Sequence, residues 1–216
     1  MDDVFANFDL VLKAFLLTIE LLVVSGLIAL AVGTLLAAFR VGPIPVLRWA
    51  GTTYVSLVRN TPLLIIFIFV FFGMPKMGID FSFFLKGCLA LTLYTSAFVC
   101  EAIRSGVNSI PLGQAEAARA IGLTFSKTMR EVVLPQAFRA VIPPLASVMI
   151  ALAKNTSVAA AFGLMEATGR MRYFTNNNVS DRWWIFMLFA VGYIIIVELI
   201  SMGAFSLERR GRVAAR

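Results

Sequence analysis

The sequence predicts an all-α membrane protein with about five transmembrane helices. Its mean hydropathy is +0.88, and only 14% of its 216 residues are charged, whereas soluble domains carry about 25%. Because one helical crossing of a bilayer takes roughly 20 apolar residues, the chain has room for several crossings joined by short loops. We therefore expect residues 1–216 to form a single transmembrane domain without a large soluble part.

Five apolar stretches are each compatible with one crossing, at about 15–39, 53–73, 83–104, 138–165 and 183–206. The first follows MDDVFANFDL, which lacks the basic start and the cleavage site of a signal peptide, so we expect a retained helix. Arg59, Asn60 and Pro62 interrupt the second stretch, and Lys154 interrupts the fourth. We expect Arg59 and Asn60 to snorkel to the membrane interface or to contact a partner.

The basic residues predict the orientation, because loops on the cytoplasmic side of a membrane carry an excess of Lys and Arg. With five crossings, one side holds twelve of them and the other holds five. The first set is Arg40, Arg48, Arg59, Arg104, Arg119, Lys127, Arg130, Arg139, Arg209, Arg210, Arg212 and Arg216, and the second is Lys76, Lys86, Arg170, Arg172 and Arg182. We therefore expect the N-terminus outside and the C-terminus inside. Inner basic loops facing anionic lipids account for the net charge of +7 without nucleic acid.

Small residues recur every four positions in the first stretch, at Ser25, Ala29, Gly33 and Ala37. Such a stripe lets two helices approach closely. The partner is either another helix of the same chain or a second subunit.

The sequence has no motif for a metal, a histidine-based catalyst or a nucleotide. It contains no His, and its only cysteines, Cys88 and Cys100, do not form a CxxC pair. It also lacks the GxxxxGK[ST] loop that cradles phosphates. We expect two free thiols, no bound cofactor and no enzymatic activity, so that any ATP used is bound by another chain.

The longest inner loop, residues 105–137, reads as two short helices rather than a linker. Pro111 suits a helix start, and LGQAEAARAI contains strong helix formers, with Ala117, Ala118 and Ile121 on an apolar side. Gly122 is expected to end this helix in a left-handed conformation. Thr124 then caps a second helix, which is expected to end before Pro135. The result is a cytoplasmic helix-turn-helix.

The EAARAIG segment, followed by VVLP, resembles the coupling loop of ATP-binding-cassette (ABC) importer permeases. Four blocks, RNTPLLIIFIFVFFGMP, GQAEAARAIGL, VVLPQAFRAVIPPL and LAKNTSVAAAFG, resemble the polar amino-acid uptake permeases in the same order. FVCEAIRSGVNSI and ALAKNTSVAAAFG are most similar to the glutamate-system permeases of actinobacteria. Ile66 departs from the family, in which Gln is common there, so no substrate contact is transferred to that position.

This resemblance implies the type I ABC importer permease fold in the bacterial inner membrane, and it assigns the inner loop. Glu116, Ala117, Ala118 and Gly122 match the family's Glu-Ala-Ala and Gly positions, with Arg119 beside them. In this family the short helix docks into a groove of the ATPase subunit. Two such subunits would hold ATP and Mg, a second permease, homologous or identical, would complete the path, and an extracellular binding protein would deliver glutamate, glutamine or aspartate.

A self-contained ion- or proton-coupled carrier is the alternative. It would show inverted internal repeats and an acidic relay. The sequence shows no repeat, and only Glu20, Glu101 and Glu198 are found near the predicted crossings.

Two further polar segments are candidate sites. Lys154, Asn155, Thr156 and Ser157 lie inside the fourth stretch, where a lone charge is costly. They either line a translocation path, or Lys154 forms a structural contact with Glu20, with Glu198 or with carbonyls freed at Pro143 and Pro144. On the outer side, Arg170 and Arg172 are candidates for docking the binding protein. Trp183 and Trp184 are typical of a membrane interface.

Overall fold

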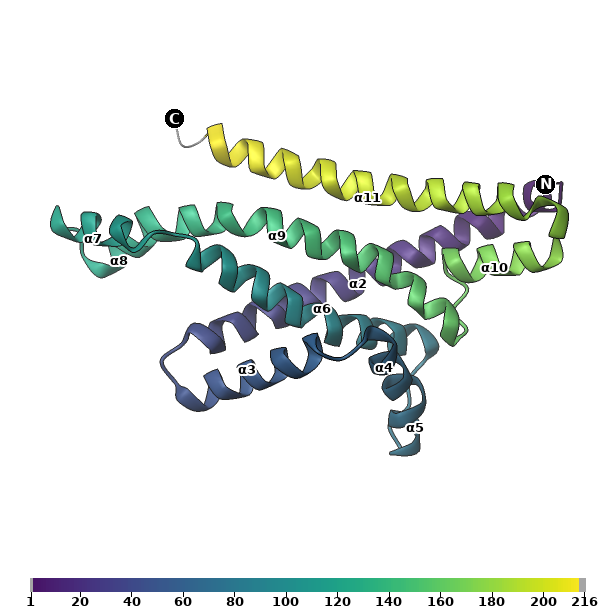
Figure 1. Ribbon diagram of the computed structural model, residues 1–216, viewed down its shortest axis with the longest axis horizontal. Coiled ribbons are helices and arrows are strands. Elements are labelled where there is room, and N and C mark those ends of the chain that lie inside the picture. Colours follow the sequence, from purple (N-terminus) through teal and green to yellow (C-terminus); the bar gives the residue numbers. More distant parts are fainter. Residues whose placement is uncertain (1, 214–216) are drawn as a thin grey trace.

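The structure is a computed structural model that describes residues 2–213, and their side chains from Val4 to Arg209. It is helical throughout, which confirms the predicted fold class (Figure 1). Four helical segments are long and apolar enough to cross a membrane, and one bent pair of helices makes a fifth candidate. The four are Phe8–Val41, Phe83–Asn108, Phe125–Phe162 and Val179–Arg209, and the pair is Pro45–Arg59 with Leu63–Lys76.

Each helical element follows directly from the chain order. The α-helices are α1 (Asp2–Ala6), α2 (Phe8–Val41), α3 (Pro45–Arg59), α4 (Leu63–Ile68), α5 (Met74–Lys76), α6 (Phe83–Asn108), α7 (Leu112–Ala120), α8 (Phe125–Lys127), α9 (Leu134–Asn155), α10 (Ala167–Asn177) and α11 (Arg182–Val213). Two π-helical turns, η1 (Phe69–Gly73) and η2 (Thr128–Val133), and two 3-10 turns, η3 (Thr156–Phe162) and η4 (Val179–Asp181), complete the set.

Helix α6 lies at the centre of the bundle, between α3 and α9, and crosses α2 (Figure 1). Helix α11 runs along α9 on the other side. The short helices α7 and α8 project at one end of the molecule and α10 lies at the other. We call these the α7 end and the α10 end.

The predicted stripe of small residues packs α2 against α6, so its partner is a helix of the same chain. Ser25, Ala29, Gly33 and Ala37 are all buried. A Cβ atom added at Gly33 would lie 2.5 Å from Val99 Cγ1 and 2.8 Å from the Ser96 carbonyl oxygen. Ala37 packs in a buried cluster with Ala97 and Cys100. Both cysteines are buried free thiols, as predicted.

The second apolar stretch is not the single helix predicted over residues 53–73. It consists of α3 and the α4–α5 segment, which are bent by 104° relative to one another. The break falls at Asn60–Pro62, because proline has no amide hydrogen and disfavours helical geometry in the residue before it. The chain restarts at once, since the amides of Ile65 and Ile66 donate to the Pro62 carbonyl at 2.9 and 3.4 Å.

The loop at the α7 end follows the prediction at its first helix and departs from it at the second. Gly122 ends α7 with a φ of +89°, and the Thr124 hydroxyl caps the next helix by accepting a hydrogen bond from the Lys127 amide at 3.4 Å. That helix does not end before Pro135, because residues Phe125–Phe162 form one continuous segment. The π-helical turn η2 lies just before Pro135, and such wider turns absorb the hydrogen bond that a proline cannot donate.

A carboxylate that the sequence analysis left unassigned holds the α10 end together. Glu166 is fully buried, and its oxygens accept hydrogen bonds from the amides of Thr168 at 2.9 Å and Gly169 at 3.0 Å. The Tyr193 hydroxyl of α11 donates to it at 2.7 Å, and the Thr18 hydroxyl of α2 lies 3.5 Å away. Glu166 thus caps α10 and joins it to α2 and α11. Burial raises the pKa of this carboxyl group.

We predict that Gly33→Ala lowers the thermal stability of the purified protein in detergent. The added methyl group collides with Val99 and with a backbone carbonyl of α6, so the expected loss is about 1–3 kcal/mol. Gly203→Ala in α11 is the matched control, because no atom lies within 4 Å of the new methyl group. Its melting temperature should stay the same or rise. Equal loss in both variants would show that α2 and α6 do not depend on this contact.

We also predict that Glu166→Ala is more destabilising than Glu166→Gln. Alanine leaves two buried amides and the Tyr193 hydroxyl without an acceptor, and each such group costs about 1–3 kcal/mol. Glutamine keeps one carbonyl acceptor and removes the cost of burying a charge. Thermal unfolding of both variants, followed by tryptophan fluorescence, measures the difference. If glutamine is as harmful as alanine, the negative charge itself holds the network.

Candidate functional site

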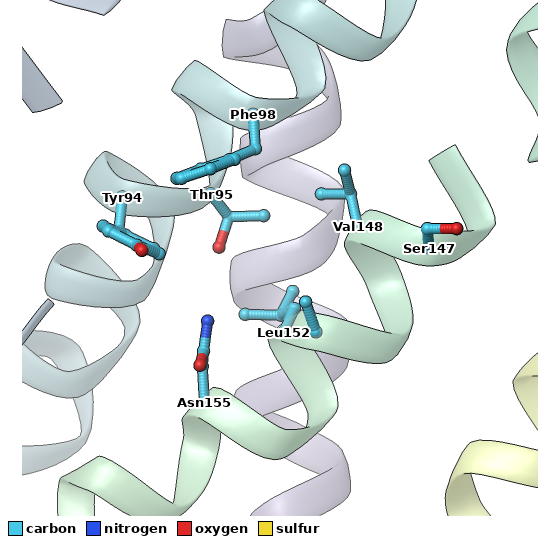
Figure 2. Close-up of a pocket in the computed structure, with 8 residues that line it drawn as sticks. Tyr94, Thr95, Phe98, Ser147, Val148, Leu152 and Asn155 are labelled. Atoms are coloured by element: carbon cyan, nitrogen blue, oxygen red, sulfur yellow. The ribbon is translucent and has the colours of Figure 1, made fainter. Parts of the chain in front are cut away.

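A pocket of about 360 Å³ lies between α6 and α9, and we call it the Asn155 pocket. It is lined by Tyr94, Thr95, Phe98, Ser147, Val148, Ala151, Leu152 and Asn155. The Thr95 hydroxyl and the Asn155 amide point into it from facing helices (Figure 2). An amide and a hydroxyl set among aromatic and aliphatic walls are typical of a site for a small polar molecule.

Helical periodicity creates this pocket. Tyr94 and Phe98 are four residues apart on α6, so they share one face, and their ring centroids lie 4.8 Å apart. Ser147, Ala151 and Asn155 repeat at the same interval along α9 and face them. The sequence analysis singled out Asn155 but not the α6 residues, because nothing in the sequence indicates which face of α6 meets α9.

The four polar residues predicted to line one path do not share one space. Asn155 lines the Asn155 pocket, whereas the Thr156 side chain is fully buried and donates to the Ala153 carbonyl at 2.7 Å. Lys154 and Ser157 line a different pocket of about 280 Å³ beside α10 and α11, which includes Tyr193. Residues 154 and 155 point about 100° apart on the helix, which separates them.

Lys154 does not form the predicted structural pair. Among the described side chains, no ion pair joins it to Glu20 or to Glu198, and all three are exposed to the surroundings of the single chain. The helix also continues through Pro143 and Pro144, so no break in α9 offers it free carbonyls.

A second polar pocket, the Arg59 pocket, continues from the Asn155 pocket, and Phe98 lines both. Its volume is about 400 Å³. It is lined by Arg40, Thr52, Val55, Ser56, Arg59, Asn60, Phe98 and Glu101. Its side chains come from α2, α3 and α6, so the contact between α2 and α6 brings them together.

Three arginines surround the carboxylate of Glu101 in this region. Arg40 donates a hydrogen bond to Oε1, and Arg104 Nη2 donates to Oε2 at 2.8 Å. Arg59 Nη1 lies 3.6 Å from Oε1, and its guanidinium lies 5.6 Å from the centroid of the Phe98 ring. Arg59 therefore neither snorkels nor sits at the end of a straight span. It ends α3 at the bend and contacts α6.

Helix α7 presents the residues predicted for coupling, but not on one apolar side. Ala118 is buried, whereas Glu116, Ala117 and Arg119 are exposed. Two large apolar residues near its ends, Leu112 and Ile121, are each 81% exposed. This helix thus combines opposite charges with apolar side chains that nothing in the chain covers.

The two arginines predicted for docking lie on α10, at the opposite end of the molecule (Figure 1). Arg172 is exposed and lines a pocket of about 400 Å³ together with Asn176. Arg170 is partly buried, and its guanidinium lies 5.4 Å from the centroid of the Tyr173 ring. The structure therefore leaves Arg172 the more accessible of the two.

Comparisons with known proteins agree with this architecture. The family described as "Binding-protein-dependent transport system inner membrane component" matches residues 16–210. The glutamate transport system permease protein GluC of Corynebacterium efficiens is 42% identical over 204 residues, covering 89% of this chain and 90% of the relative. The probable glutamine ABC transporter permease protein GlnM of Bacillus subtilis is 35% identical, covering 95% of each.

Solved structures show the same fold. A crystal structure of an amino acid ABC transporter with histidines superposes with a TM-score of 0.88 at 25% identity, covering 96% of this chain and 97% of that one. An inward-facing structure of the MetNI methionine ABC transporter superposes with a TM-score of 0.73 at 22% identity, covering 95% and 98%. This chain therefore belongs to the family of binding-protein-dependent transport system inner membrane components, and it is a multi-pass permease of the ABC transporter class.

Proposed function

We propose that this permease is the transmembrane subunit of an ATP-driven importer for a polar amino acid, with glutamate as the first candidate and glutamine and aspartate as neighbours. The similarity to relatives named for glutamate, glutamine and glutamate/aspartate transport supports this choice. Membership in a binding-protein-dependent family favours it over the self-contained carrier.

Helix α7 is the proposed coupling element, and the observation that carries this proposal is its exposed projecting surface. Leu112 and Ile121 are uncovered at the tip of the molecule, beside the charged Glu116 and Arg119. A short helix of this kind suits a groove on another protein. The α7 end would then face the cytoplasm, which agrees with the distribution of basic residues. ATP and Mg would be held by two ATPase subunits.

The path would be completed by a second permease, either homologous or a copy of this chain. The Asn155 and Arg59 pockets both open to the surface of the single chain, as expected of half a pathway. We assign Asn155 as the member of the Lys154–Ser157 run that meets the substrate. The extracellular binding protein would dock at the α10 end, where Arg172 is accessible.

The first functional prediction concerns Gly122. Its φ of +89° is unfavourable for any side chain, so Gly122→Ala should strain the turn by about 1–2 kcal/mol and tilt α7. ATPase copurification and substrate-stimulated hydrolysis in liposomes should both fall, while insertion in the membrane stays normal. Glu116→Lys should have the same effect through repulsion at the same interface.

Gly113→Ala is the matched control. Gly113 lies in the same helix with open space around it, as Gly122 does, but its backbone is an ordinary helical one. It should couple normally. Wild-type copurification and stimulation in both Gly122→Ala and Glu116→Lys would mean that α7 is not the coupling element.

The second functional prediction separates the two faces of α9. If substrate passes the Asn155 pocket, Asn155→Leu should lower uptake about tenfold, because one hydrogen-bonding group is lost from the pathway. Lys154→Met should then have a small effect. The measurement is uptake of labelled amino acid by proteoliposomes at matched permease content. The opposite ranking would place the path beside α10 and α11 instead.

A further inference from the structure

The Arg59 pocket carries more positive charge than its single carboxylate can neutralise. Arg40, Arg59 and Arg104 contribute three positive charges around Glu101, so the cluster sums to +2. Charges within an apolar bundle are costly unless they are paired or serve a function. The structure therefore holds an excess of cations that no described side chain balances.

The three guanidinium groups are not equivalent. Arg40 and Arg104 hydrogen-bond to Glu101, and the side chain of Arg40 is only 14% exposed. Arg59 is 45% exposed, its distance to Glu101 is that of an ion pair without a hydrogen bond, and none of the hydrogen bonds between described residues uses its guanidinium. A guanidinium has five N–H donors in a planar fork that matches a carboxylate.

The pocket offers room and further polar groups beside Arg59. Its volume of about 400 Å³ lies in the range of sites for small molecules. Ser56 and Asn60 line it on the α3 side, and Phe98 connects it to the Asn155 pocket. A molecule leaving the Asn155 pocket toward the α7 end passes Phe98 and then meets Arg59.

We infer that the Arg59 pocket is a second substrate station, which binds a carboxylate group of an amino acid on its way from the Asn155 pocket to the α7 end. This inference rests on the proposed function. Either the α-carboxylate or an acidic side chain can supply the group. Glu101 keeps Arg40 and Arg104 occupied, so Arg59 is the group that receives the ligand, and the excess charge favours an anion over a cation.

A cysteine reporter tests binding without relying on transport. Ser56→Cys places a thiol in the pocket, while the natural Cys88 and Cys100 are buried. In the purified complex, about 10 mM L-glutamate should slow maleimide labelling of this cysteine about fivefold, as expected for millimolar affinity. Putrescine, which has no carboxylate, should give no protection. Protection by glutamine as well identifies the α-carboxylate, and protection by glutamate alone identifies the side chain.

Adding Arg59→Gln should abolish the protection, and Arg59→Lys should restore part of it. Arg48→Gln is the matched control, because it removes the same charge from an exposed position near the start of α3, outside the pocket. Protection that survives Arg59→Gln, equal protection by putrescine or inorganic phosphate, or no protection at all would overturn the inference.

Uptake by the same variants separates this inference from the proposed function. In proteoliposomes with the partner subunits, Arg59→Gln should lower the maximal rate about tenfold relative to Arg48→Gln. If the unmodified complex transports neither glutamate nor glutamine, the proposed function fails, whatever the labelling shows. If it transports them and Arg59→Gln does so at the same rate, only the second station fails.

Discussion

The close contact between α2 and α6 is the constraint on which both pockets depend. Gly33 leaves no space for a side chain between the two helices, so their backbones approach closely. Helix α6 then presents one face toward α9, where Tyr94 and Thr95 line the Asn155 pocket, and carries Glu101 to the end of α2. A shift of α6 would therefore disturb the Asn155 pocket and the arginine cluster together.

Two carboxylates illustrate how a largely apolar bundle accommodates polar groups. Glu166 is held by backbone amides and a tyrosine hydroxyl, without a cation, and this is a neutral way to satisfy a buried acid. Glu101 is held by arginines and is part of a charged cluster that faces a pocket. The first arrangement fixes three helices at the α10 end. The second leaves a positive group available, which distinguishes a structural carboxylate from one beside a candidate site.

The sequence predicted the features that depend on neighbouring residues. Apolar runs marked the long helices, and Gly122 and Thr124 marked the turn after α7, because glycine conformation and capping are set by local chemistry. The 104° bend was foreshadowed by Pro62, but the direction in which α4 leaves depends on packing. The continuation of the helix through Pro135 was missed, because a π-helical turn is not evident from residue types.

The candidate sites were harder to predict because they join residues distant in the chain. Asn155 belonged to a polar run whose members the structure distributes over different faces. Glu166 lay at the border of a predicted span, and its partner Tyr193 is 27 residues away. Arg59 looked like an interfacial residue until α6 supplied Glu101 and Phe98. Each of these contacts requires the fold to be known.

The continuous segment from Phe125 to Phe162 has a mechanical consequence. It begins next to the turn at Gly122 and carries Asn155 near its far end, so the α7 end and the Asn155 pocket belong to one rod. A rod needs no chain of rearranging side chains to carry a displacement, because a tilt imposed at one end appears at the other as a swing that grows with length. The π-helical turn at Thr128–Val133 is its most compliant joint, which makes the stiffness of that turn the quantity that sets how much of the motion arrives.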